Sequence, residues 1–134
     1  MWTCSNCGRI YKKVNQPHCC QRIPLEKHFR NKGKAWELFN ALLEQINSKI
    51  GACQVISIPC CVHLFGHYDF LAALPKKDWL EIRFAYHREI DDQRIKFCVL
   101  TSARHYKICL DIKEAAEIDE ALIKWLREAY HLKD

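Results

Sequence analysis

Four of the nine cysteines and one of the seven histidines lie within residues 4–20, CSNCGRIYKKVNQPHCC. The spacing Cys4-x-x-Cys7 allows two thiolates to hold one metal ion. Gly8, which follows the second cysteine, can adopt a turn conformation that directs backbone N–H groups at the sulfur atoms. The opening segment therefore has the residues for one half of a metal site.

The second pair of ligands must come from His18, Cys19 and Cys20. In an extended segment, residues i and i+1 point to opposite sides and residues i and i+2 share a side, so His18 pairs better with Cys20 than Cys19 does. We predict a tetrahedral Zn²⁺ site made by Cys4, Cys7, His18 and Cys20, with Cys19 as a spare thiol. Four protein ligands leave no open position for water or substrate, so the predicted site is structural.

Three other kinds of site could use these residue types. A thioredoxin-like redox pair expects Cys-x-x-Cys at a helix N-terminus beside a βαβ unit, whereas here the motif begins a basic, hairpin-like segment. An iron or iron–sulfur centre could take the same ligands, but the histidine favours zinc. A catalytic zinc site needs an ionisable water and an orienting base, and neither H-E-x-x-H nor H-x-E…C-x-x-C occurs. The structural zinc site is the favoured interpretation.

The net charge of +5 is distributed unevenly. Residues 1–34 carry eight lysines and arginines against one acidic residue, Glu26, whereas residues 35–134 carry thirteen basic and fifteen acidic residues. A basic segment of this kind favours a polyanionic partner, although it is equally typical of a solvated surface. If the predicted ribbon binds nucleic acid or a protein partner, Arg9, Lys12 and Lys13 are the residues expected to make the contact.

The chain of 134 residues is long enough to bury a sizeable core without cross-links. No signal peptide or membrane-spanning segment is recognisable, so we expect a cytoplasmic protein with no membrane partner. An odd number of cysteines in a reducing compartment argues against a disulfide framework. The cysteines outside the opening segment are expected to be small buried hydrophobic residues: Cys53, Cys60, Cys61, Cys98 and Cys109.

The pattern of the remaining sequence predicts an α+β fold. Residues 1–22 form the zinc-binding ribbon, 23–33 a connector and 34–134 the α+β domain. Apolar residues recur at helical spacing from Lys34 to Ile50, and Gly51 stands at the C-cap position. Asp119 is a suitable N-cap for a second amphipathic helix. Both helices are expected on one face of the sheet.

Between the two helices, short apolar or alternating runs predict about five antiparallel strands. A turn near Gly66 and His67 separates two of these runs, and Pro75 ends the second. The last two runs are joined by the short segment TSARH, so their strands should be antiparallel neighbours. The runs are 55–58, two within 60–74, 80–86, 95–100 and 106–112.

The opening residues, MWTCSNCGRIYKKVNQPHCC, resemble a zinc-ribbon leader of some small bacterial proteins of unknown function, W-x-C-x-x-C-G-R-x-[FY]-K-[KR]-x-N-Q-x-H-x-C. The resemblance places the last two ligands on His18 and Cys20. Cys19 departs from the leader, which usually has no cysteine there, so exchange of ligands between Cys19 and Cys20 stays open.

The body resembles a second family. The stretches FLAALPKKDWLEIRFAYHREIDDQRI and EIDEALIKWLREAY are similar to domain of unknown function 5655, over roughly residues 35–131. That resemblance implies an α+β fold similar to small frataxin-like domains. It implies no activity.

Two groups in the strand region could form further sites. Arg83, Arg88, Arg104 and His105 would make an anion pocket if they converged, because guanidinium groups bind phosphate and carboxylate. The simpler expectation is that Arg83 pairs with Glu81, which is on the same strand.

His63 and His67 straddle a turn and could join Asp69 or a cysteine in a metal site, although histidines in strands are more often packed than ligating. Cys60 and Cys61 are adjacent, and we expect that they do not face one site together.

We therefore expect a non-enzymatic zinc-binding or adaptor protein whose basic ribbon contacts nucleic acid or a protein partner. The alternative is a small-ligand or metal-chaperone-like role for the α+β domain. A third hypothesis, an enzyme using cysteine, histidine and arginine residues of the sheet, requires a pocket that joins at least two of these residue types.

Overall fold

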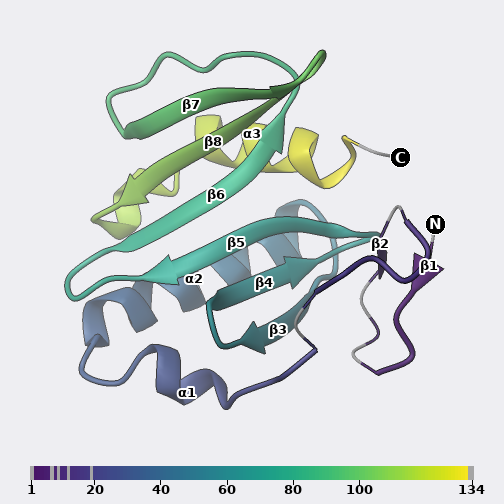
Figure 1. Ribbon diagram of the computed structural model, residues 1–134. Coiled ribbons are helices and arrows are strands. Elements are labelled where there is room, and N and C mark those ends of the chain that lie inside the picture. Colours follow the sequence, from purple (N-terminus) through teal and green to yellow (C-terminus); the bar gives the residue numbers. More distant parts are fainter. Residues whose placement is uncertain (1, 7, 9, 12, 19, 133–134) are drawn as a thin grey trace.

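The fold is taken from a computed structural model that describes residues 2–6, 8, 10–11, 13–18 and 20–132. It consists of a two-stranded N-terminal hairpin, two helices, a six-stranded sheet and a C-terminal helix (Figure 1). The N-terminal strands are β1 (Trp2–Thr3) and β2 (Ile10–Tyr11), which pair antiparallel. A short helix, α1 (Leu25–His28), lies in the predicted connector.

The first long helix, α2, spans Gly33–Lys49, close to the predicted 34–50. Its buried residues follow helical spacing: Ala35, Leu38, Phe39, Leu42 and Ile46. The backbone N–H of Gly51 bonds the carbonyl of Ile46, as expected of a residue that follows the end of a helix.

The large sheet is entirely antiparallel, with the strand order β3-β4-β5-β6-β8-β7. The strands are β3 (Gln54–Ile58), β4 (Cys61–Phe65), β5 (Asp69–Pro75), β6 (Leu80–Tyr86), β7 (Ile95–Ser102) and β8 (His105–Ile112). The predicted number of about five is one too low, although each of the six runs identified in the sequence forms one of these strands. β7 and β8 are antiparallel neighbours, as predicted, but β8 lies between β6 and β7.

The C-terminal helix, α3, spans Glu120–Tyr130 and follows the 3-10 turn η1 (Ala115–Glu117). Asp119 caps it, because its side chain accepts a hydrogen bond from the backbone N–H of Leu122. At the other end of the helix, the Tyr130 hydroxyl donates to the carbonyl of Ala52, 2.8 Å away. This bond ties the last turn of α3 to the segment that follows α2.

The two long helices lie behind the sheet in Figure 1, on the same face. Both contact the central strands β5 and β6. One large apolar core fills the space between the layers, with residues such as Leu42, Leu64, Ile82 and Leu126 fully buried. In the described part of the chain, no helix is long and apolar enough to cross a membrane.

Candidate metal centres

Three of the four predicted N-terminal ligands come together in the structure. The sulfur of Cys20 lies 3.5 Å from the sulfur of Cys4 and 3.1 Å from Nε2 of His18. Cys4 is buried, and His18 and Cys20 are half-buried. Two sulfurs and one imidazole nitrogen so close together are a donor set that suits a thiophilic cation.

The orientation of His18 is fixed by its second nitrogen. Its Nδ1 lies 2.7 Å from the carbonyl oxygen of Gln16, to which it donates in the tautomer that leaves the Nε2 lone pair on the cysteine side. Histidine ligands of metals are commonly held in this way by a carbonyl or carboxylate acceptor. The ring also contacts two aromatic side chains, Trp2 and Tyr11, with centroids 5.8 Å and 4.4 Å away.

The hairpin backbone positions Cys4. The N–H of Gly8 donates to the carbonyl of Cys4 over 2.8 Å, and Gly8 has φ 75°, a left-handed conformation that glycine adopts without strain. Strands β1 and β2 flank this turn and pair Trp2 with Tyr11. A tight turn stabilised by aromatic side chains thus brings the start of the chain against residues 18 and 20.

Several predicted residues of this end lie outside the described residues: the fourth ligand Cys7, the spare thiol Cys19 and the basic residues Arg9 and Lys12. The third predicted contact residue, Lys13, is described and exposed.

A second cluster of metal-ligand types lies in the body of the protein, at the start of β4. The sulfurs of Cys60 and Cys61 are 3.3 Å apart, and the Cys61 sulfur is 3.0 Å from His63 Nε2. These donor atoms form the other Cys/His group found among the described residues. The expectation that Cys60 and Cys61 do not face one site is therefore wrong.

The reason is the local backbone. Cys60 lies in the turn that joins β3 to β4, whereas Cys61 is the first residue of β4 and pairs with Ile58. Strand alternation applies only within the strand, so it places Cys61 and His63 on one side and leaves Cys60 free to turn its sulfur toward them. Cys60 is also exposed, so the prediction that it is a buried hydrophobic residue is wrong too.

His63 connects this cluster to Asp69 across the β4–β5 hairpin. Its Nδ1 lies 2.7 Å from Asp69 Oδ2, and the imidazole is only 17 % exposed. The register of β4 and β5 shifts between Leu64 and Phe65, so that Phe65 pairs with Asp69. This irregularity, absent from any strand pattern in the sequence, places the carboxylate beside the imidazole.

Burial raises the pKa of the Cys61 thiol to about 12, and the neighbouring Cys60 and Asp69 contribute to the rise, whereas Arg83 opposes it. In the absence of a bound cation, Cys61 is therefore a protonated thiol at neutral pH rather than a thiolate nucleophile.

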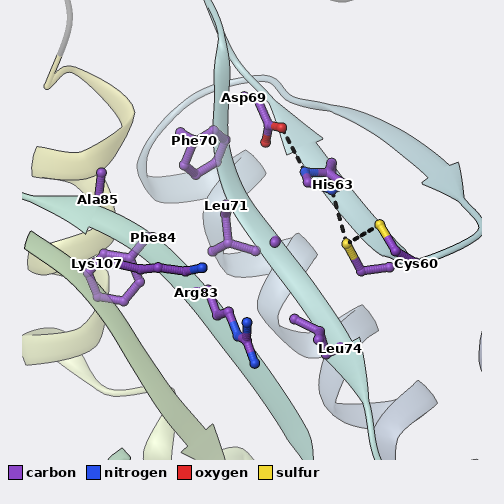
Figure 2. A pocket seen from close by; sticks show the side chains of 12 residues that line it. Cys60, His63, Asp69, Phe70, Leu71, Leu74, Arg83, Phe84, Ala85 and Lys107 are labelled. Atoms are coloured by element: carbon purple, nitrogen blue, oxygen red, sulfur yellow. Dashed lines mark hydrogen bonds and ion pairs between the residues drawn. The ribbon is translucent and has the colours of Figure 1, made fainter. Parts of the chain in front are cut away.

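A pocket of about 460 Å³ adjoins the cluster. Figure 2 shows Cys60, His63 and Asp69 along one side and Arg83, Phe84 and Lys107 along the other. It forms where the pairing of β5 with β6 ends at Ala72 and Arg83, so the strands diverge beyond that point. The pocket joins cysteine, histidine and arginine residues, as the enzyme hypothesis requires.

The four residues of the predicted anion pocket make separate contacts. Arg83 lies 2.9 Å from Glu81, and its guanidinium also lies over the Phe97 ring. Glu81 is 1 % exposed and binds Lys96 as well, 2.8 Å away. Arg83 therefore neutralises a buried carboxylate, as the simpler expectation had it.

The other three members lie elsewhere. Arg88 lies over the Tyr86 ring and donates to the carbonyl of Glu89. Arg104 is exposed in the β7–β8 turn, and His105 lies 3.2 Å from the Ser102 hydroxyl. Among the described residues, no hydrogen bond or ion pair joins these three to Arg83.

The Cys60/Cys61/His63 cluster is the candidate site that the sequence interpretation understated. The signal was present as Cys-x-His in CCVH, since residues two apart in a strand share a side. Asp69 could be named as a candidate from the sequence, but its position depends on the irregular β4–β5 register.

Comparison with known proteins places the body in a family. No curated protein and no solved structure matches the chain. The family model of DUF5655, a domain of unknown function, matches residues 25–133. That range includes the Cys60/Cys61/His63 cluster and excludes the Cys4/His18/Cys20 cluster. Since the match covers most of the sequence, the chain belongs to the DUF5655 family.

Proposed function

We propose that this protein is a zinc-binding, non-enzymatic binding protein in which an N-terminal zinc ribbon presents basic residues to nucleic acid. The observation that carries the proposal is the convergence of Cys4, His18 and Cys20, with the His18 ring held by the Gln16 carbonyl. Cys7 would complete a tetrahedral set. A closed set of four ligands makes the ion structural, and the ion would stabilise a hairpin too small for its own core.

The charge distribution supports an anionic partner. The segment of residues 1–34 carries eight of the twenty-one basic residues and one of the sixteen acidic residues. Lysine and arginine side chains that contact phosphates release counterions, which makes nucleic-acid binding weaken as salt rises. A zinc ribbon that fixes the backbone around Arg9, Lys12 and Lys13 would hold these side chains in one region of the surface.

The ligand set is tested by metal analysis of the purified full chain. C4S and C20S should each lose one equivalent of zinc relative to the wild type. C98S, at a half-buried cysteine of β7 outside both clusters, is the matched control and should keep it. Retention of all bound zinc by C4S and C20S would refute the site.

The partner is tested by fluorescence anisotropy with labelled single- and double-stranded nucleic acid over a range of salt concentrations. The triple variant R9E/K12E/K13E should bind more weakly and with a smaller salt dependence than the wild type. K124E, at an exposed position of α3, is the control. If the wild type shows no salt-dependent binding and the triple variant changes nothing, nucleic acid is not the partner, and a protein partner takes its place.

A second candidate function rests on a different observation, the pocket of about 460 Å³ beside Cys61 and His63. This second function is the binding of a small ligand or metal ion by the α+β domain, in the manner of a metal chaperone. The order of one helix, an antiparallel sheet and a second helix is in keeping with a frataxin-like fold, which we retain as a proposal about the fold alone.

A further inference from the structure

We propose that Cys60, Cys61 and His63 form a second zinc site, built into the α+β domain, with a fourth coordination position that faces the adjoining pocket. The inference deepens the second candidate function and does not depend on the N-terminal zinc site. It shares no residue with that site.

The first argument is the donor set. The cluster offers two sulfurs and one imidazole nitrogen. The Cys61 sulfur lies 3.3 Å from the Cys60 sulfur and 3.0 Å from Nε2 of His63. Two thiolates would balance the charge of Zn²⁺, which binds sulfur and imidazole ligands readily. Cys60 is exposed, so the ion can enter from solvent, whereas Cys61 is buried and His63 half-buried.

The second argument is the support of the histidine. Nδ1 of His63 lies 2.7 Å from the Asp69 carboxylate while Nε2 faces the Cys61 sulfur, and a carboxylate beside the imidazole makes it a better metal ligand.

The two clusters share this arrangement although they come from unrelated segments. In each, a histidine and a cysteine two residues apart approach through Nε2 and sulfur, at 3.1 Å in the N-terminal cluster and 3.0 Å in the body. In each, an oxygen lies 2.7 Å from Nδ1: the Gln16 carbonyl, which accepts a hydrogen bond from His18, or the Asp69 carboxylate, which is at ion-pair distance from His63. The same donor geometry therefore occurs twice among the described residues.

The third argument concerns what the body cluster lacks. Among the described residues, it groups three ligand atoms, one fewer than a closed zinc site requires. The pocket beside it is lined by the apolar side chains of Phe70, Leu71 and Phe84 and by two cationic ones, Arg83 and Lys107 (Figure 2). The fourth position is therefore available to a water molecule or a small anion. The Lys107 ammonium favours the anion, whereas Arg83 is already paired with Glu81.

The test is zinc stoichiometry of the full chain after reconstitution and removal of weakly bound metal. The wild type should retain two equivalents and C60S one. Because Cys60 is exposed, C60S removes a ligand without opening the core. H63A and C61S should also retain one, and H67A, at an exposed histidine of the next turn, should retain two. Circular dichroism establishes that each variant is folded.

Cobalt substitution gives an independent readout. In C60S and C61S, the sulfur-to-cobalt charge-transfer absorption should fall by the contribution of the body site. In C4S, it should fall by the contribution of the N-terminal site. Addition of a small anion such as azide should change the spectrum of C4S, in which only the open site remains. An unchanged spectrum would refute the open position.

The inference is overturned if the wild type binds a single equivalent that C4S removes and C60S does not. It is also overturned if Cys60 and Cys61 are found oxidised to a disulfide in protein kept under reducing conditions. Rapid alkylation of Cys61 that saturating zinc does not slow would identify a reactive cysteine and equally overturn it. The effect of C4S on bound zinc tests only the N-terminal site, and the effect of C60S tests only the body site. Either proposal can therefore be refuted while the other stands.

Discussion

His63 and Asp69 lie on opposite strands of the β4–β5 hairpin, with Nδ1 of the histidine 2.7 Å from Oδ2 of the carboxylate. The contact depends on the register shift that pairs Phe65 with Asp69. It determines which imidazole nitrogen faces Cys61, and so connects a detail of sheet geometry to the chemistry of the cluster.

Replacing the carboxylate should weaken the proposed body site without abolishing it. D69N keeps the side-chain volume and removes the charge that supports His63, and we expect zinc affinity at this site to fall about 10- to 100-fold. Competition with a chromophoric chelator measures the change. D78N, at an exposed position in the β5–β6 turn, is the charge-matched control. Equal affinities for D69N and the wild type would contradict a supporting role.

Gly66 should not tolerate a larger residue. A methyl group on its Cα would lie 2.6 Å from Cζ of Tyr130, whose ring packs over the β4–β5 turn. G66A must displace this ring and strain the hydrogen bond from Tyr130 to Ala52, so we expect a loss of about 1–3 kcal/mol in unfolding free energy.

Chemical denaturation measures the effect of G66A. G33A is the control, because nothing lies within 4 Å of its added methyl group and alanine favours helix α2. A G66A variant as stable as the wild type would show that the ring moves at no cost.

Replacement of Arg94, whose side chain is largely buried, should destabilise the fold. Its side chain is 9 % exposed, contacts Asp92 at 2.9 Å and Asp119 at 3.2 Å, and lies over the Trp125 ring. It therefore fixes the loop before β7 to the start of α3.

We expect R94A to lose about 2–4 kcal/mol of unfolding free energy, because it leaves the Asp92 carboxylate without its guanidinium partner and exposes the Trp125 ring. R94K should also be destabilised, because an ammonium group cannot reproduce the fork of the guanidinium. Thermal and urea unfolding measure both variants. R104A, in the exposed β7–β8 turn, should change stability little; comparable losses in R104A and R94A would contradict the prediction.

The same contact predicts a dependence on acid pH. The hydrogen bond from Arg94 lowers the pKa of Asp92, and burial opposes this only in part. Because the pKa in the folded state is below that in the unfolded state, Asp92 stabilises the fold above about pH 4, and this contribution is lost as pH falls further.

D92N should therefore be less stable than the wild type at pH 7, and the difference should shrink toward pH 3. Urea unfolding across this range measures it. D91N removes the same charge from the exposed neighbouring residue and controls for net charge. A difference between D92N and the wild type that does not vary with pH would contradict the assignment.

The sequence by itself determined the elements of the body. Helical spacing in α2, the Asp119 cap of α3 and the alternation in β6 are local properties of the chain, so their residue types predict them closely. The i, i+2 rule also predicted the pairing of His18 with Cys20, and the same rule applied to CCVH would pair Cys61 with His63.

Only the tertiary structure decided what surrounds these pairs. Cys60 joins Cys61 because it lies in a turn, where strand alternation no longer applies. Asp69 reaches His63 through an irregular register, and the pocket exists because β5 and β6 stop pairing beyond Ala72. Each of these depends on contacts between strands, which the order of residues along one strand does not specify.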